Sequence, residues 1–279
     1  MILVTGATGN VGGELAAALA RRGADVRAVV RDPARADLPV GVEIVRGDLE
    51  LPESLTPALA GARAVFLLGG WGDMPGLLRR IAGAGVEHVV LLTSRCVIDG
   101  RPDNPVTRMW LGSEAAVRGS GLAWTILRPS GFQSNALRWL PQLRAGDVVR
   151  APWPDVAVAA IDPADVAAVA AVTLTEPGHE GAEHTLSGPE ALTPRQQVET
   201  LGAVLGRPLR YAPLSDERAR LEMAADTPAP YIDAFFRFYS DGEFDDSPVV
   251  DTVRRVTGRE PRRFDQWARA HADAFDPQG

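Results

Sequence analysis

Apolar residues in the first half of the chain form short unbroken runs that alternate with stretches of helical spacing. The first run, Ile2 to Thr5, is typical of a buried strand, and apolar residues at positions 11, 15, 18 and 19 then predict a helix from Asn10 to Arg22. Further strands are predicted at 25–30, 42–45, 64–68, 88–93 and 122–127, with helices at 53–60, 75–84 and 105–118. This alternation indicates an α/β fold of Rossmann type, a doubly wound parallel sheet with helices on both faces.

The regular alternation stops after Pro129. Residues 131–146 have an irregular helical pattern, and residues 148–160 form short extended pieces interrupted by prolines. Asp162 then has the features of a helix N-cap, because a proline follows it at the first helical position. The remainder predicts two helices and a polar C-terminal segment, the helices lying at 194–205 and 216–225.

The length of the chain fits one large domain or a domain with an added lobe. At 279 residues and 29.7 kDa it can bury a sizeable core without disulfides or metal. Because the pattern changes near the middle, we expect an NAD(P)-binding Rossmann domain over residues 1–150. A smaller, mixed α/β substrate-binding lobe would follow over residues 151–279, partly interleaved with the first.

The charged residues narrow the possible functions. There are 36 acidic and 29 basic residues, and every basic residue is arginine. The absence of lysine excludes a P-loop ATPase, a Schiff-base enzyme and any catalytic lysine. A net charge of -7 disfavours nucleic-acid binding. We assign no function to an arginine cluster that we expect to be a solvated face, namely Arg254, Arg255, Arg259, Arg262 and Arg263.

Cysteine use and hydropathy favour a cytoplasmic protein. Cys96 is the single cysteine, so no internal disulfide can form, and we expect this thiol to be a packing residue. No basic leader precedes the first apolar run, and the most apolar later stretch contains charged residues, so we expect neither export nor a membrane span. The expected partner is a small-molecule substrate, with monomer and homodimer both left open.

The strongest motif lies between the first strand and the first helix. Its three glycines have the arrangement of a dinucleotide-binding turn: the first allows the tight turn, the second lets the backbone approach a pyrophosphate, and the third lets helix and strand pack closely. The N-terminus of the helix then supplies free N–H groups and a partial positive charge. The candidate cofactor residues in this segment are Gly6, Thr8, Gly9, Asn10, Val11 and Gly12.

The end of the second strand selects the dinucleotide. An acidic side chain there accepts the ribose hydroxyls of NAD, whereas an arginine meets the 2′-phosphate of NADP. This position is Arg31, which predicts NADP(H), with a preference of roughly 10- to 150-fold if the contact contributes about 1.5 to 3 kcal/mol. The preference would reverse if the neighbouring Asp32 pointed at the ribose instead.

Several segments together resemble an NmrA-like protein of the atypical short-chain dehydrogenase/reductase superfamily, which includes NADPH-dependent quinone oxidoreductases. They are the glycine loop at 6–12, Val30-Arg31-Asp32-Pro33, Gly47-Asp48-Leu49, and residues 120–129, 161–167 and 186–193. The resemblance implies that Asp48 and Leu49 flank the adenine, although Asp48 also fits a simple turn at a strand end. It further implies that the Gly69-Gly70 turn passes under the cofactor ribose, and that Thr93 and Pro129, at the ends of their strands, contact the cofactor.

The sequence departs from that superfamily in its usual catalytic pair, Tyr-x-x-x-Lys. The helix that should carry the pair reads Thr107-Arg108-Met109-Trp110-Leu111, and no tyrosine occurs before Tyr211. Hydride transfer does not strictly need that acid, because positioning the acceptor beside the nicotinamide supplies much of the acceleration.

Another residue must then act near the nicotinamide. Ser94, after the fifth strand, is the candidate donor to a developing oxyanion, although it also fits a strand-end cap. Arg95 could supply positive charge there, although we expect it to face the surface. The candidate apolar walls for a flat substrate are Trp71, Trp110 and Phe132, with Trp139 as a further possibility.

Other chemistries find less support. The four histidines have no metal-ligand spacing, and two of them, His179 and His184, fall in an expected glycine-rich loop, so we expect no metal. No Gly-x-Ser-x-Gly elbow is present. The sequence therefore predicts an NADP(H)-dependent oxidoreductase that transfers hydride to a small planar carbonyl compound such as a quinone. The alternatives are a nonenzymatic NADP(H)-sensing regulator and a tailoring reductase or isomerase of secondary metabolism.

Overall fold

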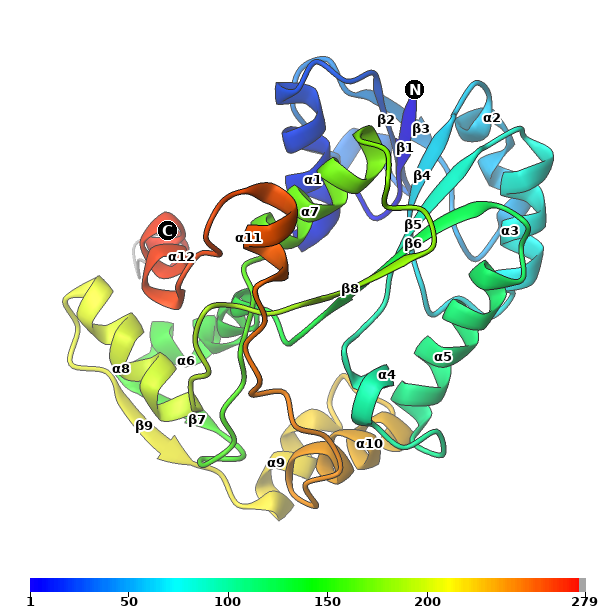
Figure 1. The fold of residues 1–279 in the computed structure, drawn as a ribbon. Coiled ribbons are helices and arrows are strands. Elements are labelled where there is room, and N and C mark those ends of the chain that lie inside the picture. The colour runs from blue at the N-terminus through cyan, green and yellow to red at the C-terminus, as the bar shows by residue number, and fades with distance from the viewer. Residues whose placement is uncertain (276–279) are drawn as a thin grey trace.

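A seven-stranded parallel sheet forms the centre of the molecule in the computed structural model, which describes residues 1–275 (Figure 1). The strand order is β3-β2-β1-β4-β5-β6-β8, so the chain winds outward in both directions from β1. The strands are β1 (Ile2–Val4), β2 (Val26–Val30), β3 (Glu43–Arg46), β4 (Ala64–Leu68), β5 (His88–Leu92), β6 (Ala123–Pro129) and β8 (Ala182–Leu186).

Helices cover both faces of this sheet. One face carries α1 (Asn10–Arg21), α7 (Pro163–Thr175) and α11 (Thr252–Thr257). The other carries α2 (Thr56–Leu59), α3 (Met74–Gly83) and α5 (Pro105–Arg118). Because successive residues of a strand point to opposite faces, Val4 and Phe66 pack into the first layer, and Leu3 and Val65 into the second. The doubly wound fold is therefore confirmed.

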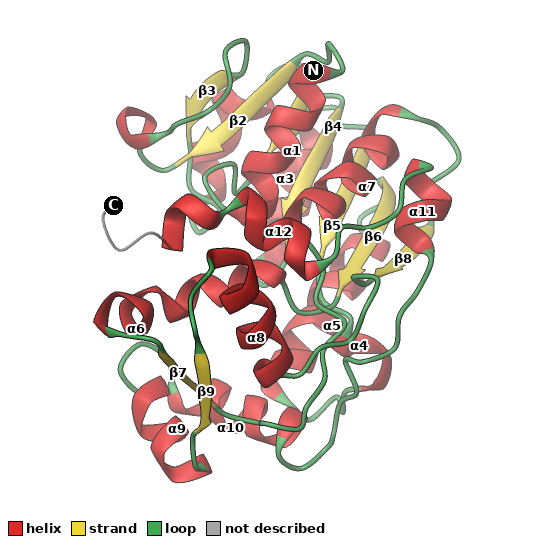
Figure 2. Cartoon of the chain, turned by 90° about the vertical axis from the view of Figure 1, so that its left-hand side faces the viewer, coloured by secondary structure: helices red, strands yellow, loops and turns green. Residues whose placement is uncertain are grey.

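A smaller lobe lies beyond the carboxyl ends of the strands (Figures 1 and 2). It contains a two-stranded parallel sheet of β7 (Val148–Ala151) and β9 (Arg210–Pro213), together with a core around the fully buried Trp267. Its helices are α6 (Leu140–Ala145), α8 (Pro194–Leu205), α9 (Asp216–Met223), α10 (Ala229–Tyr239) and α12 (Phe264–Ala270), and α4 (Cys96–Asp99) connects β5 to α5.

Two parts of the sequence prediction were wrong. The segment around His184, expected to be a glycine-rich loop, forms the edge strand β8 over residues 182–186, which pairs with β6. The expected polar C-terminal segment contains α10, α11 and α12, whose apolar faces are buried. The N-cap at Asp162 is confirmed, since its Oδ1 accepts the Ala164 N–H at 2.8 Å.

The domain boundary at residue 150 stays a prediction. Both α7 and β8 lie beyond it in the sequence and belong to the sheet layer, so the chain returns from the lobe to complete the Rossmann unit.

Candidate functional site

The glycine loop has the geometry that close backbone approach requires. Gly6 has a φ of 61°, in the left-handed region, and a Cβ there would lie 2.5 Å from Leu68 Cδ1. A Cβ on Gly12 would lie 2.2 Å from the Gly6 carbonyl oxygen, so no side chain fits at that position. The loop closes on itself because the Gly9 N–H donates to the Gly6 carbonyl at 2.9 Å. The backbone therefore needs glycine at both Gly6 and Gly12.

The N-terminus of α1 is suited to an anion. Its N-cap is Gly9, no side chain caps it, and its first turn holds no acidic residue. By contrast, Asp73, Asn104 and Asp162 cap α3, α5 and α7 with side-chain oxygens. Because the first N–H groups of a helix lack acceptors within the helix, α1 presents free donors to a pyrophosphate. The site therefore fits a dinucleotide.

A cavity of about 330 Å³ adjoins the loop. It lies between the start of α1, the start of α7 and α12, and the Asn10 side chain donates to Ser134 Oγ at 3.1 Å beside it. The sequence did not single out Ser134, which stands 124 residues from Asn10. A second cavity of about 360 Å³ lies at the amino ends of β1, β4 and β5, near Met1 and His88, away from the glycine loop.

The end of β2 presents an arginine. Arg31 is exposed, whereas the Asp32 carboxylate accepts the Ala34 N–H at 3.2 Å and so caps a short 3-10 helix, Pro33–Arg35. This capping contact holds the Asp32 side chain in its own turn. The arrangement favours Arg31 as the residue that meets the adenosine half of the cofactor.

The predicted adenine and ribose contacts lie at the ends of β3 and β4. The Asp48 Oδ1 accepts the Glu50 N–H at 3.0 Å, which is the turn-forming role, and Leu49 is 8% exposed within the core. Gly70 has a φ of 92°, and its N–H donates to Ser113 Oγ of α5 at 2.9 Å. That bond fixes the Gly69-Gly70 turn, while the cofactor contacts of these residues stay predictions.

The ends of β5 and β6 lie side by side. The Thr93 hydroxyl is buried and donates to Glu114 Oε1 at 3.0 Å, so it serves the packing of α5 on the sheet. Ser94 is half-buried, and its Oγ accepts the Cys96 N–H at 3.3 Å. Because this contact uses a lone pair, the Ser94 hydroxyl proton can still be donated. The Pro129 carbonyl accepts the N–H of Arg95 at 2.9 Å and joins the two strand ends.

The expectation that Arg95 faces the surface was wrong. Its side chain is 5% exposed, and Nη1 donates to the Pro248 carbonyl at 2.5 Å. Beside it, the Asp246 carboxyl group is 3% exposed, and its Oδ2 accepts the Gly131 N–H at 2.9 Å. Burial raises the pKa of Asp246 to about 7, against the opposing effects of the Gly131 N–H and Arg95. The sequence analysis missed Asp246, which lies 115 residues beyond Gly131 and in no motif.

Cys96 is a packing residue. Its side chain is 2% exposed in a cluster with Val106 and Phe238, and burial raises the pKa of the thiol to about 11. A thiol with such a pKa supplies almost no thiolate at neutral pH, so it is a poor nucleophile.

The three predicted wall residues pack in different places. Trp110 lies against the Gly69-Gly70 turn and against the cluster that contains Cys96. Trp71 packs on the core beneath α3. Phe132 packs on the core beneath α1 and α7. All three are half-buried. Their contact with a substrate stays a prediction.

Three histidines come together on β5, β8 and the loop before β8, and His88 is distant in sequence from the other two. His179 and His184 have ring centroids 5.4 Å apart, and His88 Nε2 lies 3.0 Å from Thr125 Oγ1. His184 thus lies on β8 and not in a loop.

Within residues 1–275, no group of three His, Cys, Asp or Glu side chains is arranged to hold a metal ion. In the same part of the chain, no helix combines the length and apolarity needed to cross a bilayer.

Comparison with known proteins agrees with this geometry. Residues 6–177 match the model of an NAD(P)H-binding family. The chain is 43% identical over 283 residues to a (4-alkanoyl-5-oxo-2,5-dihydrofuran-3-yl)methyl phosphate reductase of Streptomyces griseus, covering 100% of each protein. It is 37% identical to an NAD(P)H azoreductase of Xenophilus azovorans, covering 99% of each.

A solved structure shows the same fold. An NADPH-dependent quinone oxidoreductase from Escherichia coli, crystallised with NADPH, superimposes with a TM-score of 0.80 at 23% identity, covering 98% of this chain and 100% of that one. The expected resemblance and the expected cofactor class are therefore confirmed. The chain belongs to the NAD(P)H-binding family and is an NAD(P)H-dependent oxidoreductase.

Proposed function

We propose that this protein is an NADPH-dependent reductase whose acceptor is a small planar carbonyl compound with a conjugated double bond. The first candidate is an acylated dihydrofuranone carrying a phosphomethyl group, and quinones belong to the same chemical class. The observation that carries the choice is the 43% identity to the furanone phosphate reductase along the whole of both chains. The azoreductase, also similar over its full length, supports a flat, conjugated acceptor.

The preference for NADPH rests on the end of β2. Arg31 is exposed there, and the neighbouring carboxylate of Asp32 is occupied as a cap. A guanidinium can bond a 2′-phosphate through two N–H groups, whereas it offers little to a free ribose hydroxyl. The chain's own residues thus favour the phosphorylated dinucleotide.

The missing Tyr-x-x-x-Lys pair is compatible with this acceptor. In an acyl dihydrofuranone, one carbon of the ring double bond is flanked by two carbonyl groups. Bound NADPH would supply a hydride for the other carbon, and the negative charge of the resulting enolate would be delocalised over both carbonyl oxygens. Such an enolate needs hydrogen-bond donors more than a strong acid. Ser94, with its free hydroxyl proton at the end of β5, is the candidate donor, and solvent can protonate the carbon afterwards.

A panel of acceptors tests the proposal. NADPH oxidation would be followed with an acyl dihydrofuranone phosphate, its dephosphorylated form, a benzoquinone, an azo dye and a simple ketone. We expect turnover with the first, less with its dephosphorylated form, and none with the ketone. Turnover with the quinone alone would make a quinone, and not the dihydrofuranone, the acceptor within the proposed class. No turnover with any member, despite tight NADPH binding, would contradict the reductase proposal.

The coenzyme preference has its own test in Arg31→Ala. We expect this change to raise the Kd of NADPH by roughly 10- to 150-fold and to leave that of NADH within about twofold, because only NADPH carries the phosphate that Arg31 meets. The Kd values would come from nucleotide fluorescence titrations. Arg35→Ala, four residues away and also exposed, is the matched control. An equal loss of affinity for both nucleotides would contradict the role of Arg31.

A further inference from the structure

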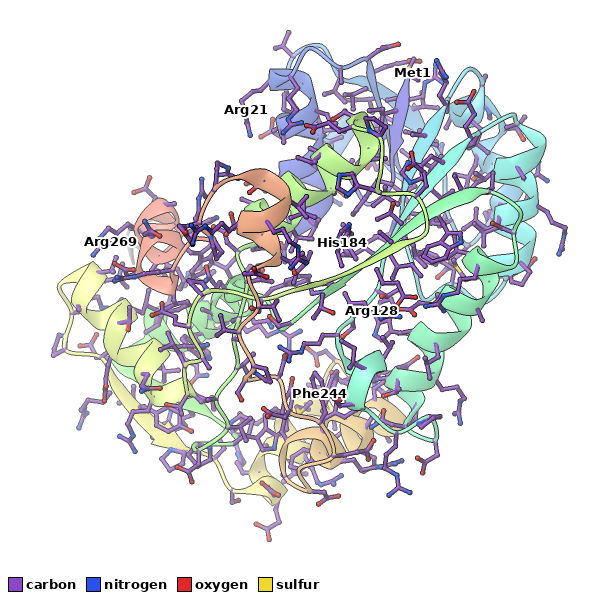
Figure 3. All side chains as sticks on the ribbon, viewed as in Figure 1. Met1, Arg21, Arg128, His184, Phe244 and Arg269 are labelled. Atoms are coloured by element: carbon purple, nitrogen blue, oxygen red, sulfur yellow. The ribbon has the colours of Figure 1, made fainter. Side chains whose placement is uncertain are left out.

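A segment from Phe244 to Val250, called the strap below, links α10 to α11. In Figure 1 it runs from α10 at the bottom of the molecule up to α11, past the end of β8. Phe244, labelled in Figure 3, anchors its start against Phe238 of α10, with ring centroids 5.4 Å apart. The Val250 N–H donates to Ser187 Oγ at 2.9 Å near its end. The strap is therefore attached both to the lobe and to the sheet.

Asp246, in the middle of the strap, forms hydrogen bonds to the segment that follows β6 and to Ala159. Its side chain accepts the Gly131 N–H at 2.9 Å, and its backbone carbonyl accepts the Ala159 N–H at 2.8 Å. The fit is close, because a Cβ on Gly131 would lie 3.1 Å from Val158 Cγ1 and 3.5 Å from Asp246 Oδ2. The hydrogen bond and the close packing from the strap thus hold Gly131, two residues after Pro129, in place.

The strap also holds the end of β5. Arg95, next to Ser94, donates from Nη1 to the Pro248 carbonyl and from its backbone N–H to the Pro129 carbonyl. Among residues 1–275, Arg95 has no ion-pair partner within 4 Å, and both its Nε and the Asp246 Oδ1 are buried without a hydrogen bond. A buried charge without a partner is costly, and the carboxylates of Asp246 and Asp245 are the nearby charges of opposite sign.

We propose that Asp246 is a positioning residue of the reductase. It holds Gly131 and, together with Arg95, fixes the strand ends between which the nicotinamide and the acceptor meet. This inference rests on the proposed function, because those strand ends matter for catalysis only if hydride transfer occurs there. Asp246 itself need not touch the substrate, since it acts through Gly131 and through Arg95 next to Ser94.

The role predicts a dependence of turnover on pH. The titratable and charged groups around Asp246 are Arg95 and Cys96 after β5, Tyr239 of α10 and Asp245 of the strap. Burial raises the pKa of Tyr239 and of Cys96, so both stay neutral near pH 7, while a bond from Ser247 lowers the pKa of the Asp245 carboxyl group, which stays ionised.

Asp246, with its pKa of about 7, is then the member of the group that changes charge between pH 6 and 8. A carboxylate accepts the Gly131 N–H more strongly than a neutral acid does. We therefore expect kcat/KM for the acceptor to fall about fivefold from pH 8.5 to pH 5.5.

Two variants separate positioning from folding. Asp246→Asn keeps an oxygen for the Gly131 N–H but carries no charge, so it should give a flat profile at about one fifth of the wild-type value at pH 8.5. Asp245→Asn removes the neighbouring, exposed carboxylate and should keep the size of the wild-type pH effect, with its midpoint at a slightly lower pH because Asp245 helps to raise the pKa of Asp246. In both, the KM for NADPH should stay close to wild type, and the Tm at a given pH should change by no more than about 2 to 4 °C. An Asp246→Asn profile that parallels wild type would overturn the proposal.

A second measurement does not depend on turnover. Hydrogen exchange of a peptide covering residues 130–133 reports the Gly131 amide in the NADPH-bound protein. We expect Asp246→Ala to accelerate exchange there by at least about tenfold and Asp246→Asn to change it little, because only the alanine lacks an acceptor. Unchanged exchange in Asp246→Ala would overturn the positioning role. If the wild type reduces no acceptor at all, the proposed function fails, whereas the exchange result still decides whether Asp246 holds this segment.

Discussion

At the scale of single residues, Gly12 carries the least replaceable contact of the glycine loop. A Cβ there would lie 2.2 Å from the Gly6 carbonyl, which is backbone and cannot move aside cheaply. We expect Gly12→Ala to lower the free energy of unfolding by roughly 1 to 3 kcal/mol and to weaken NADPH binding more than tenfold, because the N-terminus of α1 must shift. Urea unfolding and fluorescence titration measure the two effects.

Gly83→Ala is the matched control, because Gly83 ends α3 and a Cβ there would meet nothing within 4 Å. It should stabilise the protein by about 0.4 to 1 kcal/mol and leave NADPH binding unchanged. If Gly12→Ala changed stability and NADPH binding as little as this control, the close approach at Gly12 would contribute nothing to either.

Residues of the site could be predicted where their chemistry is local in the sequence. The glycine loop and Arg31 stand next to the strands that position them, so spacing alone makes them candidates, and their contacts with the cofactor stay predictions. Arg95 and Asp246 could not be found this way. Their environment depends on a strap that returns to β5 and β6 more than 100 residues later, and an isolated arginine or aspartate is usually a surface residue.

At the scale of elements, a buried ionic network fastens α5 to the sheet. Glu114 of α5 is fully buried and accepts from Arg128 at 2.9 and 2.6 Å, from Arg118 at 2.8 Å and from the Thr93 hydroxyl. Figure 3 labels Arg128 on β6, facing α5. We expect Glu114→Ala to lower the free energy of unfolding by roughly 3 to 5 kcal/mol, because Arg128 would stay largely buried without its main partner.

The exposed pair of Arg63 and Glu87 gives the comparison. Both side chains are more than half exposed, so Glu87→Ala should cost less than about 1 kcal/mol in urea unfolding at the same pH. A Glu114→Ala variant no less stable than Glu87→Ala would mean that the network adds nothing to the docking of α5.

Elements with strong periodicity were predictable, and those with mixed signals were not. The predicted bounds of α5 and β4 agree with the structure, because one is a long helix and the other an unbroken apolar run. β8 has only two apolar residues in five and follows two glycines, so a five-residue edge strand looks like a loop. The apolar residues of α10 pack on two sides, with Phe238 against Cys96 and Val106 and with Phe236 against Ala219 of α9, and the sequence alone does not define these partners.

At the scale of the whole molecule, buried titrating groups act on stability in opposite directions. Burial lowers the pKa of His88 and of His184 below the ordinary 6.5, so below that pH the unfolded chain binds more protons and acidification favours unfolding. Burial raises the pKa of Asp246 from 3.8 to about 7, so between these values the native state binds more protons and acidification favours folding. The two effects partly offset each other between pH 6.5 and the lowered histidine pKa values.

Removing one of these two groups should therefore reveal the effect of the other on the pH dependence of stability. We expect His184→Gln to make the drop in Tm from pH 7.5 to pH 5.5 smaller by about 2 to 4 °C, and Asp246→Asn to make it larger by a similar amount, since roughly 1 kcal/mol corresponds to that shift in a chain of this size. Calorimetry at the two pH values measures both. The opposite signs matter more than the sizes, because a general loosening of the fold would lower the Tm of either variant at both pH values alike. If both substitutions changed the pH dependence in the same direction, the assignment of opposing roles to these buried groups would be wrong.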